Sequence, residues 1–403
     1  MTRRSISALA AAGLLATALV APVGAQGRVV EIPAGEPVVI GTFGVLSGGD
    51  AALGQDWLYT AEIAVADRGG ELLGHPLQLF PQDGLCTVEG GAQAALAIVS
   101  NPNVVGVLGS ACSDETVGGI QSITDAGLTA ISPSATRPGL TAEDRGPEYA
   151  GFVRTAHSDT DQGPVVAEFA IAQGYERVAT IHDGSAYAEA LVGVFVETFE
   201  SLGGTVTRQE AVSKGQTDMG PALTSIAADA PDAIYFPIFT QEGGFIVDQH
   251  RDVTGLEDVA LMGSDGLFSL DFVEAAGPDV EGMFLSGPNL EAMQEGYAEL
   301  VEKYREHAGV NSPIQAFHAH GYDAANMLLD AIEDVAVENE DGSLSIDLLA
   351  LRERIYATSD FQGLTGTLSC SDTGDCGVPT IGVYEVGPET VNDGVWPPPV
   401  VYP

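Results

Sequence analysis

Residues 104–136, VVGVLGSACSDETVGGIQSITDAGLTAISPSAT, predict one strand–helix–strand unit and with it the fold. Two short apolar runs, Val104–Leu108 and Leu128–Ile131, are typical of buried parallel strands. The segment between them, Glu115–Ala126, has the pattern of a helix. Open α/β sheets bind small ligands at the carboxyl ends of their strands. The unit therefore predicts a site for a polar ligand, because small hydroxyl residues follow both strands: Ser110, Ser113, Ser132, Ser134 and Thr136.

The same alternation of strands and helices continues on both sides of this unit. Before residue 155 we expect strands at 38–43, 77–81, 104–108, 128–131 and 151–154, with helices at 55–67, 88–100 and 115–126. Beyond it we expect strands at 178–182, 205–211, 233–237 and 259–263, with helices at 162–173, 187–202, 219–228 and 243–253. Two such series predict an α/β protein with two lobes, each a doubly wound parallel sheet covered by helices.

The last third of the chain is too short for another domain and is expected to complete the two lobes. It carries predicted helices at 294–307, 317–333 and 346–357, and short strands near 366–368 and 380–385. With crossings near residues 286 and 365, the expected N-terminal lobe comprises residues 28–155 and 287–365. The expected C-terminal lobe comprises residues 156–286 and 366–395. The Pro-rich end, 396–403, is expected to be an extended tail.

Residues 1–25 have the pattern of a signal peptide. Arg3 and Arg4 precede the apolar stretch Ile6–Val20, and the small residues of Val23–Ala25 suit a cleavage site. The alternative, an uncleaved anchor, is disfavoured because the apolar stretch is too short for a good membrane span. The sequence thus predicts a soluble, monomeric protein that is periplasmic or otherwise extracytoplasmic.

The chain is strongly acidic. It has 15 Lys and Arg against 57 Asp and Glu, a formal net charge of −42. This charge excludes nucleic acid as a natural partner and disfavours anionic membranes. Because the acidic residues are spread along the chain, we interpret them as a solvated surface that says little about the ligand.

Four cysteines in an exported chain favour disulfides over free thiols. Three pairings are possible, and we expect Cys86–Cys112 and Cys370–Cys376, because the first two follow neighbouring parallel strands. A zinc site is the alternative, but paired CxxC spacing is missing. The loop between Cys370 and Cys376 also resembles a calcium loop, without the full ligand spacing, and is expected to be a tight acidic turn.

The sequence contains no enzyme signature. It lacks a phosphate loop, a GxGxxG turn after a strand, a GxSxG elbow and HExxH, so neither a metal nor a cofactor is expected. His182 and Asp183 are adjacent, but neighbours in sequence rarely form a catalytic pair, and we interpret His182 as a loop residue. A hydrolase using Asp265 or His182 would also lack a nucleophile paired with a base.

The order and spacing of several short motifs resemble periplasmic solute-binding proteins of ABC transporters, in particular those for leucine, isoleucine and valine. The resemblance covers essentially the whole mature chain. The most specific motifs are GSACS at 109–113, ISPSAT at 131–136, RT at 154–155 with DQG at 161–163, and IHD at 181–183 with Tyr187. The resemblance implies the type I periplasmic binding fold, in which two lobes joined by three crossovers close on one amino acid.

The resemblance also implies roles for individual residues. Ser113 and Thr136 would hold the ligand carboxylate through hydroxyl and backbone N–H groups. The carbonyl of Ser134 and the carboxylate of Asp265 would accept from the ammonium, and Tyr187 would close over the ligand. Ala135 lies in the same loop, and the walls around the ligand side chain would come from Leu53, Phe239 and Thr240.

Some positions depart from the family pattern. Leu53 is aliphatic where some relatives have an aromatic residue, and Thr240 and Glu242 follow Phe239 where relatives carry aromatics. The predicted function is a receptor that binds an amino acid, with branched-chain amino acids favoured, and delivers it to an ABC permease. The alternative is a sensor for amides or small carboxylates that presents its ligand to a membrane receptor.

Overall fold

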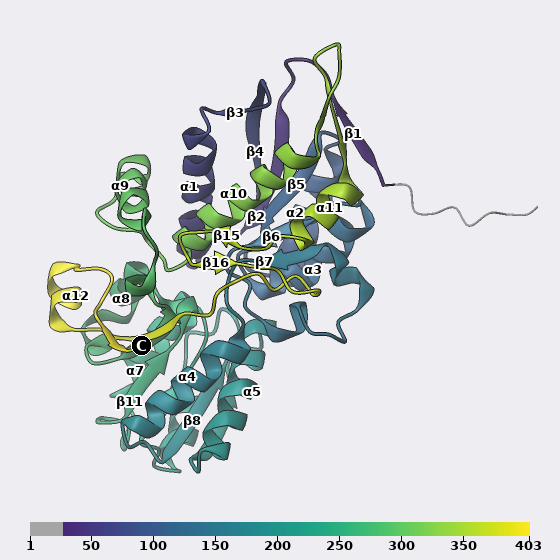
Figure 1. The fold of residues 1–403 in the computed structure, drawn as a ribbon. Helices are drawn as coiled ribbons and strands as arrows, with labels where there is room; N and C mark the ends of the chain where they lie inside the picture. Colours follow the sequence, from purple (N-terminus) through teal and green to yellow (C-terminus); the bar gives the residue numbers. More distant parts are fainter. Residues whose placement is uncertain (1–26) are drawn as a thin grey trace, which may run out of the picture.

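The computed structural model describes residues 27–403, and the predicted signal peptide, residues 1–25, lies outside this range. The described chain forms two α/β lobes, one above the other in Figure 1. Purple and blue segments, joined by green helices from the last third of the chain, build the upper lobe. Teal segments, joined by the yellow C-terminal end, build the lower lobe, so both lobes draw on distant parts of the sequence. The predicted α/β class with two parallel sheets is confirmed.

The sheet of the first lobe has six strands in the order β3-β4-β2-β5-β6-β7. All neighbouring pairs are parallel except β3–β4. Every residue of the central strand β2 is buried, as expected of a strand covered on both faces. The strands are β3 (Glu71–Leu72), β4 (His75–Asp83), β2 (Val38–Gly44), β5 (Val104–Gly109), β6 (Ala130–Ser132) and β7 (Phe152–Arg154).

Helices cover both faces of this sheet. Gly106 in β5 pairs with Ile40, the residue before Gly41 in β2, so the two glycines face opposite sides. A side chain added at Gly41 would meet Ile98 of α2, whereas one at Gly106 would meet Leu328 of α10. Helix α3 packs on α2, and α1 packs on α9 and α10. These helices and α11, which packs on α10, are α1 (Ala51–Asp67), α2 (Val88–Ser100), α3 (Ser113–Asp125), α9 (Tyr297–Ala308), α10 (His318–Val335) and α11 (Leu348–Tyr356).

The sheet of the second lobe has seven strands in the order β18-β17-β12-β11-β10-β8-β9. Only β17 and β18 run antiparallel to their neighbours. The strands are β8 (Arg177–His182), β9 (Thr205–Ala211), β10 (Ala233–Tyr235), β11 (Ala260–Gly263), β12 (Phe284–Pro288), β17 (Ile381–Glu385) and β18 (Val400–Tyr402). The helices are α4 (Asp159–Ala172), α5 (Ala186–Ser201), α6 (Gly220–Ala227), α7 (Thr240–His250), α8 (Leu270–Ala276) and α12 (Pro388–Asp393).

Side-chain caps explain where several of these helices begin. Thr87 accepts from the backbone N–H of Gly90 before α2, and Ser185 accepts from that of Ala188 before α5. Ser158 and Asp161 form a capping box at the start of α4. No helix of the described residues is long and apolar enough to cross a membrane.

The C-terminal end differs from the expected tail. Val400–Tyr402 forms β18, which pairs with β17 at the edge of the second sheet. Trp396 packs against Phe268 with ring centroids 4.7 Å apart. The prediction of a tail over 396–403 was therefore wrong. Three prolines precede the strand, and its three residues are too few to show the alternation of buried and exposed side chains that marks a strand.

Several other strands were not predicted. β12 is an interior strand of the second sheet, between β11 and β17, but its residues, FLSGP, end in Gly and Pro, which argue against such a strand. A separate three-stranded sheet joins β1 (Val29–Ile32), β14 (Leu344–Asp347) and β13 (Val337–Glu338). The short strand expected near 366–368 is confirmed as β16 (Thr367–Leu368), but its hairpin partner β15 (Phe361–Gln362) was not predicted.

Candidate functional site

The predicted binding residues lie on loops and helix starts at the carboxyl ends of the two sheets. In the first lobe, Ser113 is the first residue of α3, and Ser134–Thr136 follow β6. In the second lobe, Asp265 follows β11, and Tyr187 is in the first turn of α5. All nine predicted residues are buried, with at most 8 % of the surface of each exposed, whereas residues at the edge of a sheet that faces solvent would be more exposed. They are Leu53, Ser113, Ser134, Ala135, Thr136, Tyr187, Phe239, Thr240 and Asp265.

Hydroxyl groups hold the two strand-end loops of the first lobe together. Ser134 Oγ donates to the carbonyl of Ala111 at 2.9 Å. Ser113 Oγ accepts from the backbone N–H of Arg137 at 3.3 Å. Thr136 Oγ1, by contrast, is buried and has no hydrogen-bond partner among residues 27–403. A buried hydroxyl without a partner is costly. Thr136 lies beside the Asp159 carboxylate, whose pKa it lowers, so its hydroxyl can serve either a ligand or that carboxylate.

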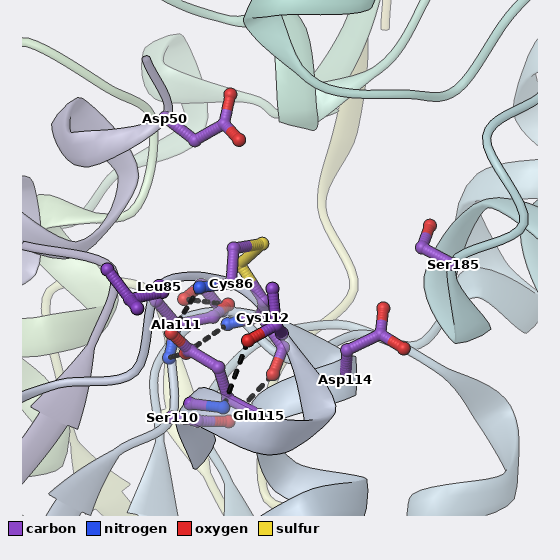
Figure 2. The surroundings of a disulfide bond; sticks show 12 residues. Asp50, Leu85, Cys86, Ser110, Ala111, Cys112, Asp114, Glu115 and Ser185 are labelled. Carbon is purple, nitrogen blue, oxygen red and sulfur yellow. Dashed lines mark hydrogen bonds between the residues drawn. A yellow bond between two sulfur atoms is a disulfide. The ribbon is translucent and has the colours of Figure 1, made fainter. Parts of the chain in front are cut away.

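A disulfide and a buried glutamate shape the same edge (Figure 2). Cys86 and Cys112 are bonded as predicted, with their Cα atoms 5.3 Å apart. Below them in Figure 2, the Glu115 carboxylate accepts from the backbone N–H groups of Cys86 at 2.9 Å and of Ala111 and Cys112 at 3.0 Å. Burial raises the pKa of Glu115 to about 7, against the opposing effect of these N–H donors. Glu115 thus links, through hydrogen bonds, the same two loops that the disulfide joins covalently.

Sequence reasoning did not identify Glu115 as part of the site. Its only signal was its place three residues after Cys112, the spacing of a capping box. The structure shows that its carboxylate also crosses to the other loop at Cys86, a contact between residues 29 positions apart. Such a contact has no local sequence pattern.

Three of the predicted second-lobe residues come together around Asp265. Tyr187 Oη donates to Asp265 Oδ1 at 2.8 Å, and the Tyr187 and Phe239 rings lie with centroids 5.4 Å apart. Gln162 Nε2, at the start of α4, donates to the same oxygen at 2.8 Å. Burial raises the pKa of Asp265, although nearby His157, Tyr187 and Gln162 lower it. Its two side-chain donors are neutral, so Asp265 is a buried carboxylate suited to a cationic ligand group.

A second buried carboxylate, Asp159, was missed. It is the first residue of α4, is fully buried, and both of its oxygens lack a hydrogen-bond partner among the described residues. Burial, and after it the charge of Asp265, raise its pKa to about 8, against the opposing effects of the Thr136 hydroxyl and of Arg154. In the sequence, an Asp after Ser158 at a helix start is explained by capping alone, so nothing local marks it as part of the site.

The lobes contact each other at the rim of this region. Asp114, at the start of α3, points toward the second lobe near Ser185 in Figure 2, and its carboxylate accepts from the backbone N–H of Ala186 at 3.2 Å. Lys214 of the second lobe donates to the carbonyl of Cys86 at 3.0 Å and lies 3.8 Å from the Asp50 carboxylate. These contacts join the two lobes directly.

The remaining predicted residues are also buried, and their role as walls around a ligand stays a prediction. Leu53 lies in α1 and can offer only an apolar surface. Phe239 lies under the Lys214 ammonium, 5.6 Å from the ring centroid, and Thr240 begins α7 behind it. Glu242 accepts from the backbone N–H of Gly215 at 2.5 Å, and burial raises its pKa. Among residues 27–403, no group of three or more His, Cys, Asp or Glu side chains could hold a metal ion.

Comparisons with known proteins agree with this architecture. The model of the periplasmic binding protein family matches residues 37–386. The chain is 29 % identical over 257 residues to the Leu/Ile/Val-binding protein of Escherichia coli strain K12, which covers 63 % of this chain and 68 % of that protein. The crystal structure of a leucine-binding protein, LivK, from Thermotoga maritima has a TM-score of 0.76 at 26 % identity, covering 87 % of this chain and 96 % of that one.

Two further structures share the fold. LivJ from Streptococcus pneumoniae, in complex with isoleucine, has a TM-score of 0.77 at 24 % identity and covers 91 % of this chain and 100 % of that one. A solute-binding protein of an ABC transporter from R. palustris, in complex with benzoate, has a TM-score of 0.74 at 19 % identity and covers 87 % of this chain and 94 % of that one. Proteins with this fold therefore bind chemically different solutes.

Proposed function

Because this chain belongs to the periplasmic binding protein family and is a solute-binding protein of the Leu/Ile/Val-binding type, we propose that it binds an amino acid, preferably a branched-chain one. It would close its two lobes on the ligand and deliver it to an ABC permease from a periplasmic or other extracytoplasmic location. The named relatives are binding proteins, and we propose no catalytic activity.

The observation that carries the proposal is the Asp265 carboxylate, buried in the closed cleft and hydrogen-bonded only by neutral side chains, those of Tyr187 and Gln162. A buried carboxylate needs a cationic partner, and the α-ammonium of an amino acid supplies one. On the first lobe, the Thr136 hydroxyl and the backbone N–H groups of Ser113 and Thr136 would hold the α-carboxylate. Donors at one end and an acid at the other suit a zwitterion, with Leu53 and Phe239 beside its side chain.

Isothermal titration calorimetry against the twenty common amino acids tests this proposal. We expect binding of L-leucine, L-isoleucine and L-valine at micromolar Kd or tighter, with a negative heat-capacity change from burial of the aliphatic side chain. Binding of no amino acid would overturn it.

The alternative remains a receptor for amides or small carboxylates, and one structure with this fold holds benzoate. It differs in one respect, because a simple carboxylate has no ammonium to pair with Asp265. Titration with benzoate and with acetamide, under the same conditions, separates the two. Tight binding of benzoate without binding of leucine would favour the alternative.

A further inference from the structure

The second disulfide, Cys370–Cys376, is far in sequence from the predicted ligand-binding loop at residues 134–136, but one arginine links the two. Arg154, the last residue of β7, is completely buried. Its Nη1 donates to the carbonyls of Ala135 at 3.3 Å, Thr136 at 2.9 Å and Arg137 at 3.0 Å. One guanidinium therefore holds three consecutive carbonyls of the loop that carries the predicted ligand groups.

The other side of the same guanidinium is held by Asp375. Arg154 Nε and Nη2 donate to the two carboxylate oxygens, both at 2.8 Å, in a bidentate pair. Thr141, at the far end of the ligand loop, joins them: its hydroxyl accepts from Arg154 at 2.7 Å and donates to Asp375 at 3.0 Å. Burial raises the pKa of Asp375, but Arg154 outweighs this and keeps the pKa below its ordinary value.

Asp375 is itself placed by the Cys370–Cys376 loop. The disulfide joins residues six positions apart, and within the loop the Ser371 N–H donates to the Asp375 carbonyl at 2.8 Å. The loop docks on the edge of β7 as a parallel bridge: Arg154 N–H donates to the carbonyl of Gly374, and Cys376 N–H to that of Arg154. After the loop, the chain continues into β17 of the second sheet.

We propose that the disulfide loop and Asp375 position the ligand-binding loop: the loop presents Asp375, Asp375 orients Arg154, and Arg154 fixes the backbone of residues 135–137. The inference rests on the proposed function for the identity of the ligand loop. Asp375 and Arg154 are positioning residues, since neither needs to touch the ligand. The acidic residue of this turn, Asp375, thus pairs with a group inside the protein, the Arg154 guanidinium.

Two variants test this inference. Asp375→Asn keeps the shape but removes the charge that orients Arg154. The double variant Cys370→Ser with Cys376→Ser keeps the ion pair but frees the loop. The matched control is Asp279→Asn, which breaks the ion pair of Arg251 and Asp279, 2.7 Å apart on the surface of the second lobe.

Hydrogen–deuterium exchange of the ligand-free protein is the first measurement. The N–H groups of Ala135 and Arg137 are hydrogen-bonded to Ser132 Oγ and Ser113 Oγ, so this segment reports on loop order. We expect exchange in a peptide spanning 134–141 to be about fivefold or more faster in both variants, with α2 and the control unchanged. Equal acceleration in α2 would indicate general destabilisation and overturn the proposal, as would exchange at the wild-type rate.

Affinity is the second measurement. We expect Kd for L-leucine to rise about tenfold in both variants and to stay constant in the control. Faster exchange with unchanged affinity would overturn the positioning role. If the wild type binds no amino acid, the proposed function fails, while the exchange measurement still decides whether Asp375 orders the loop. If Asp375→Asn does not fold, the double serine variant decides both points.

Discussion

At the scale of single residues, the proposed site contains two buried carboxylates, one more than a single ligand ammonium would need. Asp159 and Asp265 are both buried, and the charge of Asp265 raises the pKa of Asp159. Asp265 has two side-chain donors of its own. The oxygens of Asp159 have no well-placed donor among the described residues, and only the nearby Thr136 hydroxyl and Arg154 oppose the rise of its pKa. We therefore expect Asp265 to carry the charge that pairs with a ligand and Asp159 to be protonated near neutral pH.

Replacing Asp265 by Asn tests the first half of this assignment. The variant keeps the hydrogen-bonding shape but loses the charge, so Kd for L-leucine should rise about 10- to 100-fold, the equivalent of one charge-assisted hydrogen bond. Calorimetry measures it, with Asp271→Asn, an exposed position in the same lobe, as the control. Wild-type affinity in the Asp265 variant would remove the observation that carries the proposed function.

The pKa of Asp159 predicts a pH dependence of stability. Its pKa is about 8 in the folded protein against an ordinary 3.8, so between these values the folded state binds one proton more than the unfolded state. The free energy of unfolding should therefore fall as pH rises through this window, by about 1.4 kcal/mol per pH unit from this group.

Thermal unfolding of the ligand-free protein between pH 5 and pH 8 measures this effect. We expect Tm of the Asp159→Asn variant to fall less steeply with rising pH than that of the wild type. The exposed control Asp252→Asn should follow the wild-type slope. Parallel slopes for wild type and Asp159→Asn would mean that Asp159 is ionised throughout.

At the scale of elements, the strand-end loops of the first lobe depend on Glu115 as well as on the disulfide. Three backbone N–H groups from two loops donate to its carboxylate, and Glu115 is fully buried. An unsatisfied buried N–H costs roughly 1–3 kcal/mol. The start of α3, with Ser113, therefore relies on this one side chain.

Glu115→Ala should lower the free energy of unfolding by about 3–5 kcal/mol, because it leaves these donors without a partner and opens a cavity. Urea unfolding measures the loss. Glu115→Gln keeps one acceptor and should lose less, and Glu306→Ala, at an exposed position of α9, should change stability by less than about 0.5 kcal/mol. A loss below about 1 kcal/mol in Glu115→Ala would show that the disulfide alone holds the loops.

At the scale of the whole molecule, closure brings the second lobe against acidic residues of the first. The Asp114 carboxylate accepts a hydrogen bond from the Ala186 N–H. The Lys214 ammonium donates to the Cys86 carbonyl and forms an ion pair with Asp50. Burial raises the pKa of both Asp50 and Asp114, and the charge of Lys214 opposes this rise in both, joined by that of Arg137 at Asp114. Closing the lobes thus places one lysine among several carboxylates, and its charge favours the closed state.

Lys214→Ala should shift the ligand-free protein toward open forms and raise Kd for L-leucine by about three- to tenfold, because binding must then supply the lost closure energy. Small-angle X-ray scattering should give a larger radius of gyration for the ligand-free variant and the wild-type value at saturating leucine. Lys303→Ala, which removes an ion pair with Asp67 inside the first lobe, is the control. Equal affinities would show that Lys214 has no part in closure.

The sequence by itself determined the alternation of strands and helices, and with it two parallel sheets and the edge where a ligand would bind. These features follow from local periodicity: α2 spans Val88–Ser100 and β9 spans Thr205–Ala211, as expected. It also predicted the two disulfides, although the strands that precede Cys86 and Cys112, β4 and β5, are not neighbours as expected but lie on either side of β2. The motif resemblance added the family and the candidate ligand residues.

Only the tertiary structure decided which polar groups of that edge are satisfied and which are free. Three side chains of this region find their partners in distant parts of the chain: Glu115 pairs with Cys86, Arg154 with Asp375, and Lys214 with Asp50. The same holds for β18, whose three residues become a strand only because β17 offers an edge. Burial and pairing depend on what the fold brings together, and a local pattern carries no information about a partner 221 residues away, as in the Arg154–Asp375 pair.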